Sequence, residues 1–382
     1  MKKETIRYII YALLLVIAFA GCNEAEVPVP EDDEWVAIEL VGLDSAVEVT
    51  RGEGEIDNAT IIVFQATEED TYEFLYCRTI NYGNNERVYL KRGATYKVFA
   101  IANLDDANCP DDEEVTADTY FDDVKTLDGL AQKYFISAVE QPGAAPDKMP
   151  MISGTTESPF ETVVLPERLA LDGEGKYPVV TLPLRRLYTK VAVNIYNHAN
   201  SEVDLVSYYA NNIPANSWIV ERANDDLDGD YPQILTTPAA GYTRSSLTGI
   251  GTSTTEGAYK KYNFDIYCLE NRRGTVSGLT STNVYDRKAL APEYAFEICF
   301  QGNVTVNEKE EVLQTYVVVG KGYDEVNTPI YNNFDVDRNC IYTVNIYVNG
   351  VGNVVADSRR MYLNVAINGE LTPPEDGGDT WF

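Results

Sequence analysis

Histidine and the sequence patterns typical of enzymes are almost absent from this chain of 382 residues. His198 is its one histidine, so a Ser/His/Asp or Cys/His catalytic arrangement would have to use that residue. It stands in an asparagine-rich segment, 197–200, which we interpret as a solvated loop. No G-x-S-x-G, HExxH, phosphate-binding or dinucleotide-binding glycine pattern occurs. We therefore expect no enzyme, although glycosidase-type carboxylate pairs are neither located nor excluded in so acidic a chain.

Cysteine is scarce, and its spacing is not that of a metal site. The chain has six cysteines. Five of them lie beyond residue 22, none in a CxxC pair, and an odd number cannot all form disulfides. We expect most of these five to be buried thiols on strands: Cys77, Cys109, Cys268, Cys299 and Cys340.

One acidic segment, 224–230, has some features of a calcium loop. Asn224, Asp226 and Asp228 take its first, third and fifth positions, and Gly229 takes the sixth. Leu235 then stands at the twelfth position, where a bidentate glutamate is needed. An acidic turn is the better interpretation, so we predict no metal and no cofactor.

Basic residues are half as frequent as acidic ones, 30 against 60, for a net charge of −30. Such a surface repels nucleic acid, and we set nucleic-acid binding aside. Tyrosine is abundant, with 27 residues against 12 phenylalanines and 3 tryptophans. Tyrosines flanked by valine, isoleucine or threonine suit a half-buried pleated surface, which predicts many strands.

Long apolar runs are confined to the leader. Residues 1–3 begin a basic segment, residues 8–20 are almost entirely apolar, and Gly21 precedes Cys22. This pattern predicts a secretory signal over 1–21. It also predicts bacterial lipoprotein processing, with cleavage between Gly21 and Cys22 and acylation of the Cys22 thiol; several acyl groups would anchor it firmly. The alternative is an ordinary secretory leader in which Cys22 is incidental.

The rest of the chain predicts an all-β protein with two β-sandwich domains and few short helices. Residues 22–34 are acidic and proline-bearing, which indicates a tether. We expect an N-terminal domain over 35–181 and a C-terminal domain over 182–382. The only helices that we expect lie between residues 120 and 135. Strands are expected at 36–41, 59–64, 73–77, 86–90, 95–103, 163–165, 179–182, 184–196, 262–269, 294–301, 315–321, 342–349 and 361–367.

Arg51 stands in a glycine-containing loop between the first two expected strands. It could be an ordinary exposed arginine. Alternatively, a protease could cut between Arg51 and Gly52, since loop tips of small and polar residues are where chains are most easily nicked. That cut would separate the first strand, with Val36, Ile38 and Leu40, from the rest of its sheet.

Several segments together resemble the fimbrillin family, the lipoprotein-derived pilins of type V pili. The resemblance includes the lipobox leader, the strand at 36–41, the Arg51 loop and the strand at 61–64. Segment 93–103 looks like the family's G-x-Y-x-V-x-A-x-A-N strand, and 184–191 like the basic opening of its C-terminal domain. Segments 267–271 and 337–344 look like its Y-x-L-E-N segment and its R-N-x-x-Y-x-V strand. The order and spacing of these segments make the resemblance fairly specific.

This resemblance implies two transthyretin-like β-sandwich domains and assembly by strand exchange. It implies a monomeric precursor anchored by lipid in the outer membrane, and a mature subunit in a cell-surface fimbrium. An arginine-specific protease would cut in the loop after the first strand, which would remove segment 35–51. A strand of another pilus subunit would then fill the groove.

The C-terminal segment departs from that pattern. Residues 368–379 are rich in proline, glycine and acid, and they do not suit a donor strand. This favours a tip or accessory subunit with a role in adhesion over a stalk subunit, with an anchor subunit as the third option. Its host or bacterial surface ligand is unknown. A protein of another class also fits the anchor, acidity and aromatics: a surface glycan-binding lipoprotein of an outer-membrane uptake system.

Overall fold

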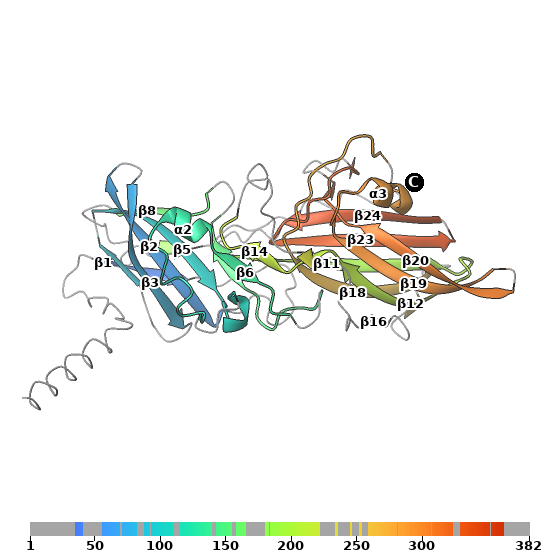
Figure 1. The fold of residues 1–382 in the computed structure, drawn as a ribbon, viewed down its shortest axis with the longest axis horizontal. Helices are drawn as coiled ribbons and strands as arrows, with labels where there is room; N and C mark the ends of the chain where they lie inside the picture. The colour runs from blue at the N-terminus through green and yellow to red at the C-terminus, as the bar shows by residue number, and fades with distance from the viewer. Residues whose placement is uncertain are drawn as a thin grey trace, which may run out of the picture.

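The computed structural model consists mostly of β-strands arranged in two halves along the chain (Figure 1). It describes residues 35–40, 56–68, 71–81, 88–91, 93–110, 115–139, 143–154, 158–165, 180–182, 184–221, 234–235, 245–246, 252–253, 259–280, 282–306, 308–323, 329–351 and 353–362. The all-β fold predicted from the tyrosine-rich composition is confirmed.

The N-terminal half contains two sheets around one hydrophobic core. The smaller sheet has the order β4-β1-β9, from strands β4 (Val88–Lys91), β1 (Trp35–Leu40) and β9 (Val180–Leu182). The larger has the order β10-β7-β5-β2-β3, with β8 also paired to β5. Its strands are β10 (Leu184–Arg186), β7 (Met151–Ser153), β5 (Thr95–Ala102), β2 (Asn58–Glu68), β3 (Thr71–Asn81) and β8 (Glu161–Val164).

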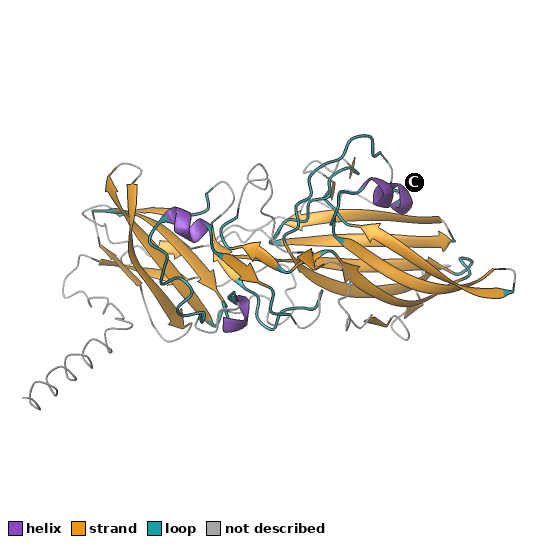
Figure 2. Cartoon of the chain, viewed as in Figure 1, coloured by secondary structure: helices purple, strands orange, loops and turns teal. Residues whose placement is uncertain are grey.

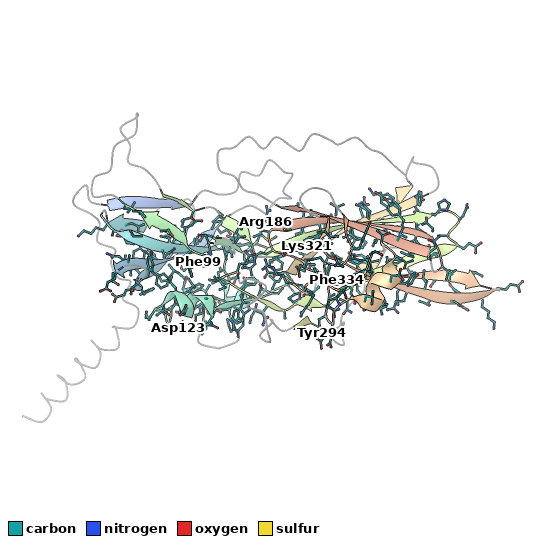
Figure 3. All side chains as sticks on the ribbon, turned by 90° about the horizontal axis from the view of Figure 1, so that it is seen from above. Phe99, Asp123, Arg186, Tyr294, Lys321 and Phe334 are labelled. Carbon is teal, nitrogen blue, oxygen red and sulfur yellow. The ribbon has the colours of Figure 1, made fainter. Side chains whose placement is uncertain are left out.

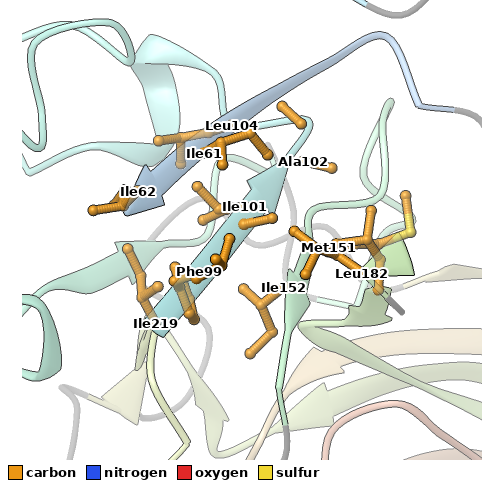
Figure 4. Close-up of a cluster of buried hydrophobic side chains, with 14 of the residues drawn as sticks. Ile61, Ile62, Phe99, Ile101, Ala102, Leu104, Met151, Ile152, Leu182 and Ile219 are labelled. Carbon is orange, nitrogen blue, oxygen red and sulfur yellow. The ribbon is translucent and has the colours of Figure 1, made fainter. Parts of the chain in front are cut away.

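The apolar runs of β2 and β5 build the middle of this core. Residues 59–64 of β2 and 98–102 of β5 are all buried, on both faces of the sheet. A strand that is covered on both faces is expected to be almost continuously apolar, and Thr60 is the one polar residue in these two runs. Figure 4 shows Phe99 and Ile101 of β5 among Ile152 and Leu182 from neighbouring segments.

The C-terminal half contains a second sandwich with a core of its own. One sheet has the order β17-β18-β11-β23-β24 and the other β16-β12-β19-β20. The first contains β17 (Thr252–Ser253), β18 (Tyr259–Leu269), β11 (Tyr188–His198), β23 (Cys340–Gly350) and β24 (Asn353–Tyr362). The second contains β16 (Ser245–Ser246), β12 (Val203–Asn211), β19 (Glu297–Val306) and β20 (Lys309–Val318).

Buried and partly exposed side chains alternate along the central strands of the five-stranded sheet. In β11, Val191, Val193 and Ile195 are buried in the core, while the residues between them keep part of their exposure. β23 alternates in the same way. Because successive side chains point to opposite faces, one face of this sheet lies on the core and the other faces outward.

Short elements complete the fold (Figure 2). Three small strand pairs are β6 (Tyr134–Ile136) with β14 (Asn216–Trp218), β13 (Ile213–Pro214) with β15 (Ile234–Leu235), and β21 (Gly322–Tyr323) with β22 (Pro329–Ile330). The helices are η1 (Asp106–Asn108), α2 (Leu127–Ala131) and α3 (Val284–Leu290). Within the described ranges, no helix reaches the length and apolar character that a membrane crossing needs.

Three expectations from the sequence need correction. Helices are not confined to residues 120–135, because α3 lies at Val284–Leu290. Asn283 caps its N-terminus, since its side chain accepts hydrogen bonds from the backbone N–H groups of Tyr285 and Asp286. His198 is not in a loop but is the last residue of β11. The single strand expected at 184–196 is divided, since β10 pairs with β7 in the N-terminal half while β11 begins the C-terminal sheet.

Candidate functional site

The first strand lies in the middle of the smaller N-terminal sheet. β1 pairs antiparallel with β4 from Trp35 to Ile38 and parallel with β9 from Ile38 to Leu40. It therefore links two strands that are far apart in the sequence, and without it these two strands would have no pairing to each other in this sheet. Figure 1 shows β1 at the outer end of the N-terminal half.

The two neighbours of β1 contribute side chains to the core. Leu90 of β4, paired with Val36, and Leu182 of β9, paired with Leu40, are both 0% exposed. Removing the middle strand would therefore open a site that has free backbone N–H and C=O groups and an apolar floor. An edge of this kind is a template for an added strand.

The predicted site residues differ in how far the structure describes them. Val36, Ile38 and Leu40 lie on β1, where the structure gives their pairing. Gly21, Cys22, Arg51 and Gly52 lie outside the described residues, as does the acidic segment 224–230. Lipidation at Cys22 and cleavage after Arg51 therefore stay predictions.

A second site, which the sequence analysis missed, is a cluster of buried charges between the two halves. We call it the junction cluster: Arg185, Glu221, Glu270, Arg272, Asp337 and Arg338. Glu221 accepts from Arg185 at 2.9 Å and also pairs with Arg272. Arg272 also lies 3.1 Å from Asp337 and 3.4 Å from Glu270. Burial lowers the pKa of Arg272, but the carboxylates of Glu270, Asp337 and Glu221 outweigh this and hold it above its usual value.

Arg338 is the most enclosed member of the junction cluster. Its side chain is 1% exposed, and its Nε donates to Glu270 Oε2 at 3.0 Å. The other guanidinium nitrogens donate to the carbonyls of Ile219 and Trp218 and to Ser217 Oγ. These acceptors surround β14, which pairs with β6 of the N-terminal half, so Arg338 supports the segment that joins the two sandwiches.

Further hydrogen bonds cross the same junction. The backbone N–H of Arg186 donates to Asn339 Oδ1 at 3.1 Å, and that of Tyr267 donates to the carbonyl of Gly143 at 2.9 Å. Lys321 lies 3.5 Å from Asp337. Figure 3 shows Arg186 and Lys321 near the middle of the molecule. Members of the junction cluster pair with one another and with backbone carbonyls, an arrangement that suits holding two domains together rather than binding a substrate.

The thiols and the histidine do not form a catalytic arrangement among the described residues. No disulfide joins the five described cysteines, which are all buried except the partly buried Cys77: Cys77, Cys109, Cys268, Cys299 and Cys340. Burial raises the pKa of the Cys268 thiol to about 12, so it stays protonated at neutral pH. The Nδ1 of His198 accepts a hydrogen bond from the backbone N–H of Asn200. No group of three or more potential metal-ligating side chains occurs in the described part of the chain.

Comparisons with known proteins show the class of fold. No protein-family model and no curated protein matches the sequence. Among solved structures, a candidate cell adhesion protein from Bacteroides eggerthii is similar over 87% of this chain and 97% of its own, with 11% identity and a TM-score of 0.50. At that identity the likeness establishes the fold, an all-β arrangement shared with an adhesion protein.

Two fimbrial proteins are similar over comparable lengths. The tip fimbrial protein Mfa3 from Porphyromonas gingivalis covers 86% of this chain, with 98% of its own length aligned, 13% identity and a TM-score of 0.46. A fimbrial assembly protein from Parabacteroides distasonis covers 85%, with 94% of its own length aligned, 14% identity and a TM-score of 0.42.

Proposed function

We propose that this protein is a pilus subunit that joins its neighbours by exchange of the first strand. The observation that carries the proposal is the position of β1, a strand of six residues in the middle of a three-stranded sheet. The fold shared with a cell adhesion protein and the family resemblance in the sequence support the same role. This role needs no catalytic group.

The exchange would begin with proteolysis after Arg51. Before the cut, segment 41–57 ties β1 covalently to β2. After it, β1 is held only by its backbone hydrogen bonds and side-chain packing. A donor strand from another subunit can replace it without a net loss of hydrogen bonds, because it offers the same N–H and C=O groups to β4 and β9. A longer apolar donor would bury more surface, at roughly 25 cal/mol per Å², and would make the joint stable.

The proposal also assigns a position in the pilus to this subunit. The composition of residues 368–379 disfavours a donor strand, so we assign the chain to a tip or accessory position. Such a subunit would accept a strand at the β1 site and would not pass one on. The precursor would be held at the outer membrane by lipid on Cys22 until the protease releases it.

The N-terminus and mass of the native protein test this proposal. We expect assembled protein to begin at Gly52 without lipid, and the precursor to begin at Cys22 with lipid. Arg51→Ala should abolish the cut and the assembly, yet leave the fold intact, because a surface loop change rarely exceeds about 0.5 kcal/mol. Arg78→Ala, a change of a partly exposed arginine on β3, is the matched control and should assemble normally.

Two results would count against the proposal. Normal assembly of the Arg51→Ala variant would show that Arg51 is only a loop residue. Assembled protein that still begins at lipidated Cys22 would replace the strand-accepting role with that of an anchor subunit.

A further inference from the structure

Three tyrosines gather on the outward face of the C-terminal sheet, on neighbouring strands. They are Tyr196 of β11, Tyr259 of β18 and Tyr347 of β23. The rings of Tyr196 and Tyr347 are stacked, with centroids 5.0 Å apart and planes at 11°. Tyr259 stands edge-on to both, with its centroid 6.4 Å from each. All three side chains keep part of their exposure, so the cluster is in contact with solvent.

His198 extends this cluster toward the end of β11. Its ring packs edge-on against Tyr259, with centroids 4.9 Å apart. The chain's one histidine therefore lies on the aromatic surface rather than in a loop. We call this surface, made of Tyr196, His198, Tyr259 and Tyr347, the aromatic face.

A row of carboxamides lies beside the aromatic face, two residues before Tyr196 on β11, two before Tyr347 on β23 and four after Tyr259 on β18. Asn194 pairs in register with Asn263 on one side and with Asn345 on the other. Asn194 Nδ2 donates to Asn345 Oδ1 at 3.0 Å, which orients both amides, and Asn263 is exposed. A carboxamide both donates and accepts hydrogen bonds, as does a hydroxyl group.

The charge of this face differs from that of the chain. The protein carries a net charge of −30, but Asp265 is the one acid among the described outward residues of β11, β18 and β23; on the next strand, β24, Asp357 pairs in register with Asn345. The carboxylate of Asp265 is paired with Lys190 at 3.0 Å. The ammonium of Lys261 lies 5.2 Å from the ring centre of Tyr196. On these three strands the face therefore offers mainly aromatic and carboxamide groups, and its one carboxylate is ion-paired.

We propose that the aromatic face and its carboxamide row bind carbohydrate. A pyranose ring has apolar C–H groups that pack on aromatic side chains and hydroxyls that pair with carboxamides. A glycan lying across the strands would meet both kinds of group at once. A neutral glycan also avoids the repulsion that an acidic partner would meet from the rest of the surface.

This inference names the ligand class for the adhesive role proposed above, but it rests on the C-terminal sheet alone. It therefore needs neither cleavage at Arg51 nor exchange of β1. An uncleaved, monomeric chain should therefore bind carbohydrate. The strand-exchange proposal and this one can then fail independently of each other.

Affinity electrophoresis of the lipid-free full chain tests the proposal. Native gels would contain dextran, yeast mannan or guar galactomannan, and the mobility of the protein would be measured against polysaccharide concentration. We expect at least one of the three to retard the protein. Tyr347→Ala and Tyr196→Ala should each weaken the retardation about tenfold, because each removes an aromatic contact surface.

Two further variants keep the test independent of folding. Asn263→Ala changes an exposed side chain and should weaken binding several-fold without altering the melting temperature. Tyr285→Ala removes another exposed tyrosine, 38% exposed on α3, and should bind like the unmodified protein. Retardation that survives Tyr347→Ala, Tyr196→Ala and Asn263→Ala would overturn the proposal, as would no retardation by any of the three polysaccharides.

A glycoprotein probe distinguishes sugar from polypeptide. Gastric mucin and the same mucin after chemical deglycosylation would be immobilised and compared. Binding that is lost on deglycosylation supports the proposal. Equal binding to the deglycosylated polypeptide, abolished by Tyr347→Ala, would overturn it and assign the aromatic face to a protein partner.

Discussion

β1 and β11 are both middle strands, but they are held very differently. β1 pairs with β4 over Trp35–Ile38 and with β9 over Ile38–Leu40, so no more than a few residues are bound on either side. β11 pairs with β18 over its whole length, Tyr188–His198, and with β23 over Lys190–Asn197. β1 is therefore held by a much shorter ladder than β11, which is what the proposed exchange of β1 requires.

The surroundings of the two strands reinforce this difference. β1 is followed by segment 41–57, whose cleavage would free it. β11 follows β10 directly and lies next to the junction cluster, since the hydroxyl of Thr189 donates to the carbonyl of Asp337. In the proposed exchange, the N-terminal sandwich would contain the replaceable strand, and the C-terminal sandwich and the junction would provide the fixed frame.

Proline substitution should give the largest difference in effect between β1 and β11. Proline removes a ladder hydrogen bond and is poorly tolerated inside a sheet. Val193→Pro in β11, a buried position, should yield no folded protein. Ala37→Pro in β1 should leave the C-terminal sandwich folded and loosen the N-terminal one. Circular dichroism and limited proteolysis would measure both effects, and equal damage by the two variants would contradict the comparison.

Loss of the most enclosed junction arginine should have the next largest effect. Arg338→Ala leaves Glu270 and several backbone carbonyls without their buried donor. Breaking a buried ion pair in this way costs about 3–5 kcal/mol. Urea denaturation would measure the loss, with Arg78→Ala as the control. A cost of less than about 1 kcal/mol would show that the junction is not a fixed frame.

A smaller effect is expected at alkaline pH. Burial raises the pKa of Cys268 and of Tyr188 to about 12 each, from 9.0 and 10.0. Between the unfolded and folded values, the native state binds more protons than the unfolded state, so stability falls as the pH rises. We expect the melting temperature to decline from about pH 9 upward, and less steeply in Cys268→Ala. An identical decline in that variant would remove Cys268 as a cause.

The strands that could be predicted from the sequence are those with alternating or continuous apolar residues. The strands at 59–64, 95–103 and 342–349 correspond to β2, β5 and β23, because a strand buried on one or both faces leaves that pattern in the sequence. β12 was missed, since Asp204 and Ser207 interrupt its apolar residues where the ladder also has a bulge. α3 was missed because seven residues are too few for a helical period to stand out.

The sites were less predictable than the fold. The first strand could be predicted because residues 36–41, apolar except for Glu39, stand between polar segments. The junction cluster could not be predicted, because Arg185, Glu221 and Arg338 are far apart in the sequence. Only the packing of the two sandwiches brings them together. The aromatic face likewise depends on the register of three strands, which no local pattern specifies.

Exchange of the first strand after cleavage tests the central claim most directly. The lipid-free precursor would be cut with an arginine-specific protease and incubated with an isotopically labelled peptide of residues 23–51. Native mass spectrometry would then follow the peptide that stays bound. We predict an early cut after Arg51, a compact product and replacement of the unlabelled segment by the labelled one. A precursor that is not cut there, or a cut product that keeps its original segment indefinitely, would contradict the account.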